Sequence, residues 1–130
     1  MSRYAVQTEK APGAVGPYSQ GIVAGGLLFA SGQLPLDPAT GKMVEGDIQV
    51  KARRCLDNLA AIAEAAGITL SHAAKVTVFL ADMGDFAAVN AVYKECFEAP
   101  FPARSAFQVA ALPLGAPIEI EAIFALQSTV

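Results

Sequence analysis

The run from Ile118 to Leu126 constrains the fold more than any other segment, because its alternation is typical of a β-strand. Successive side chains of a strand point to opposite faces of the sheet. Apolar and acidic residues alternate here, with Ile118, Ile120, Ala122 and Phe124 on one face and Glu119 and Glu121 on the other. A strand with one apolar face has to bury that face against a second layer. The sequence therefore predicts a sheet that is covered on one side.

Four further runs have strand character. Residues 19–24 and 27–31 are separated by Gly25-Gly26, a pair that can adopt the positive φ angles of a tight hairpin turn. Residues 75–80 are β-rich, and residues 104–111 alternate like 118–126. Asp37-Pro38-Ala39-Thr40-Gly41 predicts a turn after the hairpin.

Two segments have helical spacing. Apolar and small residues recur at steps of three and four between Asp47 and Ala66, with Asp47 placed as an N-cap and Gly67 placed just after the end. Residues 85–98 repeat the pattern before Pro100 stops it. The predicted order is β-β-α-β-α-β-β, an α+β fold with one sheet packed against two helices. We expect a single domain over residues 1–130, since no repeat or linker divides the chain.

Composition bears on partners and location. The chain is 54% hydrophobic and only 16% charged, so some apolar surface is expected to contact another copy of the chain. A net charge of -3 argues against nucleic acid or an anionic membrane as partner. There is no apolar run of spanning length and no secretory signal pattern at the start, which indicates a cytoplasmic protein.

Cysteine and histidine give little support to metal or redox chemistry. Cys55 and Cys96 lie far apart, each within a helical pattern, and are interpreted as reduced thiols. His72 is the only histidine, which leaves little basis for a histidine-rich metal site or a catalytic triad. We expect no metal site.

Arg104 and Glu119 are the two candidates for chemistry. Arg104 follows Phe101-Pro102-Ala103 at the start of a strand, where its guanidinium could bind a carboxylate through two parallel hydrogen bonds. A surface ion pair is the structural alternative. Glu119 shares a strand face with Glu121, and one of the two could activate water while the other tunes its charge or remains exposed. Solvated edge carboxylates are the alternative there.

The spacing of these two residues indicates that one chain cannot supply both to a single small ligand. If the last two strands form a hairpin around Leu114, Glu119 pairs near Ala110 and Arg104 lies six residues further on. At ~3.3 Å per residue the separation is roughly 20 Å. A shared site would then take Arg104 from one chain and Glu119 from another.

Several motifs occur together in order along nearly the whole chain. They are Gly16-Pro17-Tyr18-Ser19-Gln20-Gly21, Ala30-Ser31-Gly32-Gln33, Asn58-Leu59, Val89-Asn90-Ala91-Val92-Tyr93, Phe101-Pro102-Ala103-Arg104-Ser105 and Ile118-Glu119-Ile120-Glu121-Ala122. In this combination the chain resembles the YjgF/RidA family of reactive-intermediate deaminases. The resemblance implies a chorismate-mutase-like fold and a homotrimer whose pockets lie between subunits.

The same resemblance implies a reaction and roles for residues. Similar proteins hydrolyse 2-aminoacrylate and related enamines or imines, released by pyridoxal-phosphate-dependent dehydratases, to 2-oxo acids and ammonia without a cofactor. Arg104 would hold the substrate carboxylate and Glu119 would position or activate water. The pocket would be shaped by Tyr18, Ser31, Gly32 and Asn90, four residues whose positions alone would indicate turn or capping chemistry.

One departure and two alternatives remain. Some relatives carry cysteine two residues after the arginine, where this chain has Ala106, so no thiol can contribute there. The same pocket could serve a trimer that senses 2-oxo acids or amino acids, or contacts a protein, without catalysis. RNA cleavage is attached to some relatives, but the acidic charge and the single histidine give it little physical support.

Overall fold

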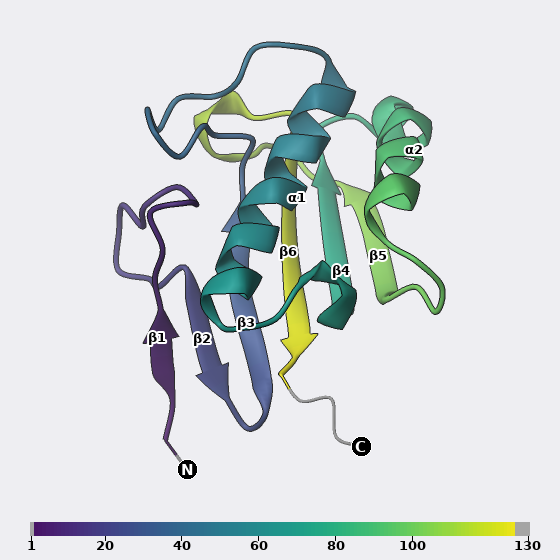
Figure 1. Cartoon of the computed structure of the whole chain (residues 1–130). Helices are drawn as coiled ribbons and strands as arrows, with labels where there is room; N and C mark the ends of the chain where they lie inside the picture. The colour runs from purple at the N-terminus through teal and green to yellow at the C-terminus, as the bar shows by residue number, and fades with distance from the viewer. Residues whose placement is uncertain (1, 127–130) are drawn as a thin grey trace.

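A six-stranded mixed sheet with two helices forms the molecule (Figure 1). The computed structural model describes residues 2–126. The elements in chain order are β1 (Tyr4–Val6), β2 (Gly21–Ala24), β3 (Leu27–Gln33), α1 (Ile48–Ala65), β4 (Ala73–Leu80), α2 (Phe86–Cys96), β5 (Ala103–Gln108) and β6 (Ile118–Ala125). Across the sheet the order is β1-β2-β3-β6-β4-β5, and only the pair β4 and β5 is parallel among these neighbours. The α+β prediction is confirmed.

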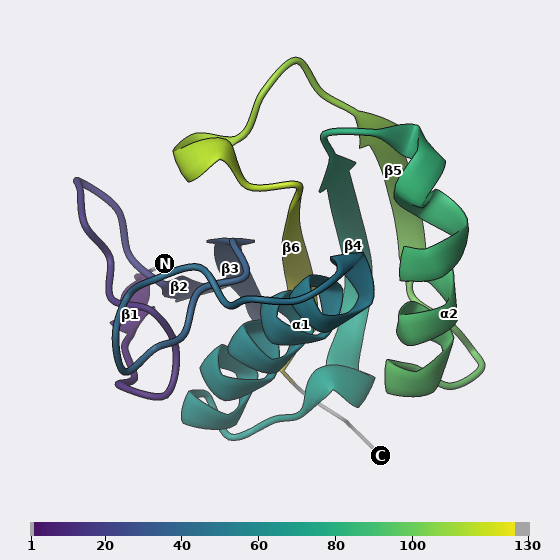
Figure 2. The ribbon, with the colours of Figure 1, turned by 90° about the horizontal axis from the view of Figure 1, so that it is seen from above.

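Both helices lie on the same face of the sheet (Figure 2). Helix α1 buries a stripe made of Ala52, Cys55, Leu56, Asn58, Leu59, Ile62 and Ala63. Every second residue of the strands packs against the helices. In β6 these residues are Ile118, Ile120, Ala122 and Phe124, as the alternation predicted. Full burial of each large aliphatic or aromatic side chain stabilises the fold by roughly 1.5–3 kcal/mol. This layer between helices and sheet is the hydrophobic core.

Local signals in the sequence agree with the structure. Gly25 and Gly26 have φ angles of 59° and 78°, as a tight hairpin between β2 and β3 requires. The side chain of Asp47 accepts a hydrogen bond from the Val50 backbone N–H at 3.0 Å, so Asp47 is the N-cap of α1. Gly67, just beyond the helix, has a φ of 84°.

Two expectations about the strands are wrong. The predicted order lacks β1, which has three residues and shows no alternation long enough to be recognised. The last two strands do not form a hairpin, because β4 lies between β5 and β6. Helix α2 carries the chain from β4 to β5, and a strand that returns through a helix pairs in parallel with the strand it left.

Buried amides hold the loops around the sheet. Asn58, which is 0% exposed, donates from Nδ2 to the carbonyls of Leu34 and Leu36 at 3.2 and 3.0 Å. Its Oδ1 accepts two hydrogen bonds from the Arg54 guanidinium. These contacts fix the segment that leaves β3 against α1.

The other face of the sheet, which we call the open face, is covered by none of the helices in residues 2–126. The ladder places on this face Ile22, Phe29, Lys75, Thr77, Phe79, Ser105, Phe107, Glu119, Glu121 and Ile123. Phe29 and Phe107 are 41% and 44% exposed, although each is a large apolar side chain. The open face therefore combines apolar side chains with the two acidic residues of β6.

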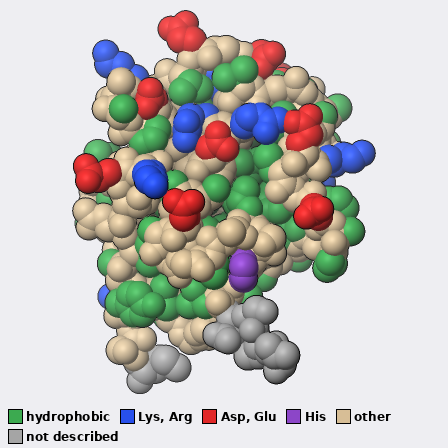
Figure 3. All heavy atoms as spheres, viewed as in Figure 1, with side chains coloured by type: hydrophobic (Ala, Val, Ile, Leu, Met, Phe, Trp, Pro, Cys, Tyr) green, Lys and Arg blue, Asp and Glu red, His purple; other side chains and the backbone are tan. Residues whose placement is uncertain are grey.

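Charges on the helix-covered side are scattered. Lysine, arginine, aspartate and glutamate side chains alternate over this face, and no broad basic patch forms on it (Figure 3). Among the described residues, no helix has the length and apolar character needed to cross a bilayer.

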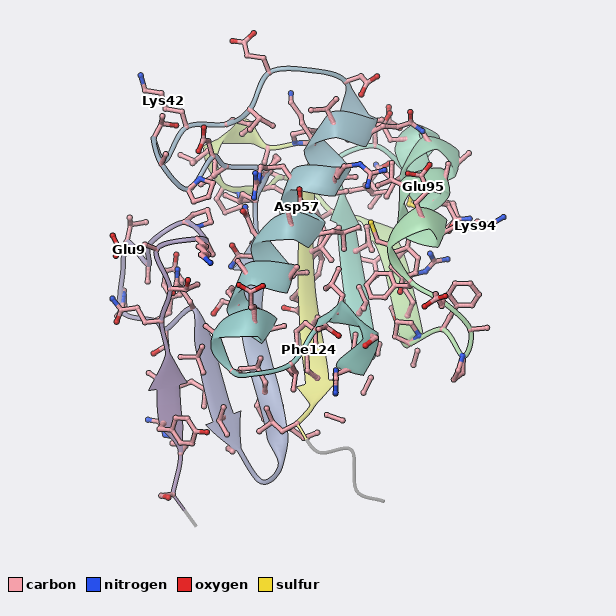
Figure 4. The ribbon with its side chains drawn as sticks, in the orientation of Figure 1. Glu9, Lys42, Asp57, Lys94, Glu95 and Phe124 are labelled. Atoms are coloured by element: carbon pink, nitrogen blue, oxygen red, sulfur yellow. The ribbon has the colours of Figure 1, made fainter. Side chains whose placement is uncertain are left out.

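We predict that Asn58→Ala lowers the free energy of unfolding by about 2–4 kcal/mol, because it removes the partner of the Leu36 carbonyl and of the Arg54 guanidinium and one of the two partners of the Leu34 carbonyl. Asp57→Ala is the matched control, since Asp57 points outward from the same helix (Figure 4). Denaturant unfolding of both variants checks the prediction. A change of less than about 0.5 kcal/mol in Asn58→Ala would contradict it.

Candidate active site

Arg104 lies in a cluster of α2 side chains on the helix-covered side of edge strand β5. Its Nη1 donates a hydrogen bond to Asn90 Oδ1 at 2.7 Å. Its Cζ lies 5.2 Å from the centre of the Phe86 ring and 4.6 Å from the centre of the Tyr93 ring. We call Phe86, Asn90, Tyr93 and Arg104 the arginine cluster.

The guanidinium has no carboxylate partner in the part of the chain that the structure describes. Among residues 2–126, the ion pairs join Lys10 to Glu64 and Arg53 to Glu95, and neither involves Arg104. The surface ion pair considered from the sequence is therefore absent from the described chain. Arg104 is exposed and makes its hydrogen bond to a neutral amide. Its positive charge is available to an anionic ligand.

Glu119 lies beside an irregularity in β3. Ala30 pairs with Ala122 and Gln33 pairs with Ile120, so Ser31 and Gly32 together oppose the single residue Glu121. This is a β-bulge, a feature that often lies next to active sites. A Cβ atom on Gly32 would lie 2.5 Å from Glu119 Oε2, closer than any real side chain allows. Gly32 thus gives the Glu119 carboxylate its space.

Tyr18 and Ser31 lie at the same end of the sheet. Ser31 donates from its hydroxyl to the Ser19 carbonyl at 2.6 Å, and its backbone N–H donates to the Gln20 carbonyl at 2.9 Å. Tyr18 and Ser31 line an open hollow of about 690 Å³ together with Phe29 of the open face. We call Tyr18, Ser31, Gly32 and Glu119 the bulge cluster.

Burial raises the pKa of Glu119 above its ordinary value, and the negative charge of Glu121 raises it further. The two carboxyl groups lie on the same face of β6, two residues apart. Desolvation disfavours the charged form, and so does a neighbouring like charge. A cation that approached Glu119 would relieve both effects.

Arg104 and Glu119 point to opposite faces of the sheet. Val76 of β4 pairs with Arg104, and Phe79 of the same strand pairs with Glu119. Three positions along a strand reverse the direction of the side chain. The arginine cluster therefore lies on the helix-covered side and the bulge cluster on the open face. The separation of the two residues within one chain was predicted, but the hairpin offset given as its cause is wrong.

The structure thus brings the predicted residues together in two groups. It joins Arg104 to Asn90, and it joins Gly32 to Glu119 with Ser31 and Tyr18 nearby. Phe86 and Tyr93 were predicted as part of an apolar helix face and not as contacts of Arg104. Phe86, Asn90 and Tyr93 are positions i, i+4 and i+7 of one helix, and such positions share one side. This spacing was the signal from which the contact with Arg104 could have been predicted.

Other reactive side chains lie outside both clusters, although the charge of Glu119 contributes to the raised pKa of Cys55. Cys55 is buried and Cys96 partly buried, and burial raises the pKa of each thiol. His72 lies in the short turn before β4, where its Nδ1 is 3.4 Å from the Thr69 backbone nitrogen. Within residues 2–126, no three His, Cys, Asp or Glu side chains gather closely enough to hold a metal ion.

The sequence behind this fold matches a known class of protein. A family model described as Endoribonuclease L-PSP matches residues 8–126. The chain belongs to this family, which is the YjgF/RidA family that the motifs indicated.

Particular relatives carry more specific names. The RutC family protein y4sK of Sinorhizobium fredii is 55% identical over 93% of this chain and 96% of its own length. The 2-iminobutanoate/2-iminopropanoate deaminase of Capra hircus is 50% identical over 95% of this chain and 90% of its own. The crystal structure of E. coli TdcF with bound serine has a TM-score of 0.89 and 45% identity, covering 96% of this chain and 99% of that one.

We predict that Glu121→Gln lowers the pKa of Glu119, because it removes the like charge. A pH titration of the carboxyl ¹³C resonances checks this, with Glu45→Gln as a control at an exposed site. An unchanged or higher pKa of Glu119 in Glu121→Gln would contradict the prediction.

Proposed function

We propose that this protein hydrolyses 2-aminoacrylate and related small imines to 2-oxo acids and ammonia. The observation that carries the proposal is Arg104, an exposed guanidinium held by Asn90 and without a carboxylate partner in the described chain. A relative with 50% identity is named as a deaminase of 2-iminobutanoate and 2-iminopropanoate, two substrates of this class. The serine bound to TdcF is likewise a small molecule with a carboxylate.

Each residue would contribute a limited part of the chemistry. The guanidinium of Arg104 would hold the substrate carboxylate through parallel hydrogen bonds. Tyr18 and Ser31 would shape the other side of the pocket, and Gly32 would leave room for Glu119. Orientation of a reactive imine next to a positioned water supplies much of the rate, so no covalent nucleophile is required.

The reaction proceeds by addition of water and loss of ammonia. 2-Aminoacrylate first takes a proton from solvent at its methylene carbon and becomes the iminium form. The oxygen of water then bonds to the imine carbon while the C=N electron pair moves to nitrogen, and Glu119 accepts a proton from that water. Protonated Glu119 gives its proton to the amine nitrogen, and the C–N bond breaks with its electrons on nitrogen. The hydroxyl gives its proton to the Glu119 carboxylate as its O–H electrons form the C=O bond, and Glu119 then returns a proton to solvent. The products are a 2-oxo acid and ammonia.

The site would be completed between two chains. Arg104 and Glu119 lie on opposite faces of the sheet, so one chain does not present both to one ligand. Arg104 of a neighbouring chain would place a positive charge beside Glu119, whose pKa is raised within the single chain. It would favour the carboxylate form, which is the form that accepts a proton from water.

A homotrimer would satisfy this requirement. Closed symmetric oligomers present the same two surfaces at every contact, so each chain in a ring gives its arginine cluster to one neighbour and its bulge cluster to the other. The exposed Phe29 and Phe107 on the open face supply the apolar surface such a contact buries. We place this trimer in the cytoplasm, beside the enzymes that release such intermediates.

Ligand sensing without turnover is the second candidate, and the serine-bound TdcF structure favours it. It uses the same arginine and needs no proton acceptor at Glu119. The two functions therefore differ in what a change at Glu119 does.

We predict that the native protein accelerates ammonia release from 2-aminoacrylate generated in situ. Arg104→Ala should lower kcat/KM by roughly 100-fold through loss of the charged hydrogen bonds. Glu119→Gln should lower kcat by about 100-fold or more and largely spare carboxylate binding. Lys94→Ala and Glu9→Gln are matched controls at exposed positions. Binding without turnover in the native protein would favour sensing over catalysis.

We predict that Arg104→Ala and Glu119→Gln chains restore each other when assembled together. Half of the chains carry an intact arginine and half an intact glutamate, so about a quarter of the sites between chains regain both residues. Native chains mixed equally with the double variant give a further check. Sites between chains leave about a quarter of the native activity, whereas sites within chains leave about half. Absence of recovery in the first mixture would exclude the shared site.

A further inference from the structure

One stripe of α2 contacts the guanidinium of Arg104 on several sides. Phe86, Asn90 and Tyr93 occupy positions i, i+4 and i+7 of the helix, which share one side. The two rings approach the Arg104 Cζ atom, at 5.2 and 4.6 Å, and Asn90 accepts a hydrogen bond from Nη1. All three residues of the stripe converge on one functional group of the neighbouring strand.

We propose that Phe86 and Tyr93 are positioning residues for Arg104, which with Asn90 hold its guanidinium ready for a substrate carboxylate. The inference rests on the proposed function, because it assigns the way in which that site binds its substrate. The rings contact the guanidinium, and Asn90 Oδ1 accepts a hydrogen bond from one N–H of Nη1. Within residues 2–126, the structure records no other hydrogen bond of this guanidinium, so the Nε and Nη2 N–H groups stay available to a carboxylate.

The physical basis is the different chemistry of the faces and the edge of a guanidinium. The faces are weakly hydrated and stack on aromatic rings, while the N–H groups around the edge donate hydrogen bonds in a fixed geometry. An arginine side chain that is free in solution loses rotamer freedom when it binds a ligand. A side chain already held by two rings loses less, so its affinity for the ligand is higher.

The Tyr93 hydroxyl helps to separate the role of the ring from that of the oxygen. Tyr93 is only 4% exposed, and no described residue forms a hydrogen bond with its hydroxyl. The Tyr93 ring contacts the Arg104 guanidinium, and its centre lies 4.5 Å from the centre of the Phe97 ring. Phenylalanine should therefore replace Tyr93 without loss of the proposed role.

Tyr93 also belongs to the core, so a loss of stability has to be distinguished from a loss of positioning. Phe86 is only partly buried and offers a second position where the aromatic ring can be removed. Phe124 is a fully buried phenylalanine under α1, two strands away from β5, and serves as the core control (Figure 4).

The test uses Phe86→Leu, Tyr93→Leu, Tyr93→Phe and Phe124→Leu, with the first two also made in the Arg104→Ala background. Pyruvate, a 2-oxo acid product, is the binding probe in calorimetry, and KM, kcat and thermal stability are measured alongside. We expect Phe86→Leu and Tyr93→Leu to weaken pyruvate binding and raise KM by about three- to tenfold, with kcat changed less than about twofold. Tyr93→Phe and Phe124→Leu should bind pyruvate like the native protein. In the Arg104→Ala background the leucine variants should have no further effect.

Four outcomes would overturn the proposal. They are a leucine effect that persists without Arg104, a Tyr93→Phe effect as large as that of Tyr93→Leu, unchanged binding in both leucine variants, and the absence of Arg104-dependent pyruvate binding. If Tyr93→Leu does not fold, Phe86→Leu decides the question. Ring-dependent binding in a protein that releases no ammonia would refute the deaminase function and support the inference. Normal turnover, with KM and pyruvate binding unchanged in Phe86→Leu and Tyr93→Leu, would support the deaminase function and refute the inference.

Discussion

Strand β6 pairs with β3 on one side and β4 on the other, and the rest of the structure depends on the contrast between its two faces. One face is apolar and packs under α1, which sets the core. The opposite face carries Glu119 and Glu121, which cannot be turned inward without burying charge. The register of the whole sheet is therefore specified strongly, because a slip of one residue would exchange the two faces.

The same contrast separates the two candidate site residues Arg104 and Glu119. Strand β4 pairs with both β6 and β5, so side chains of all three strands alternate in register. Arg104 therefore points to the helix-covered side and Glu119 to the open face. Each residue then has surroundings that suit the role proposed for it. The guanidinium lies among two rings and an amide of α2, and the carboxylate lies beside a glycine that leaves it room. Neither group neutralises the other within the chain, which keeps both free for a ligand.

Local features could be predicted from the sequence, and features set by distant contacts could not. The Gly25-Gly26 turn and the Asp47 cap depend on residues that are neighbours in sequence. The alternation in 118–126 is equally local and indicated the buried face correctly. The insertion of β4 between β5 and β6 joins segments far apart in the chain, and the same residues would fit a hairpin equally well. The contact of Arg104 with Phe86 and Tyr93 was missed for the same reason.

The bulge in β3 is a single extra residue in an otherwise regular ladder. Removal of either Ser31 or Gly32 would let the strand pair with β6 without interruption from Leu27 onward. The hydrophobic layer would keep its partners, but the space beside Glu119 would close. The length of this strand, by one residue, therefore affects the candidate site but not the packing of the core. A change of one residue in the length of this strand would therefore alter the surroundings of Glu119 while the apolar face of β6 kept its contacts.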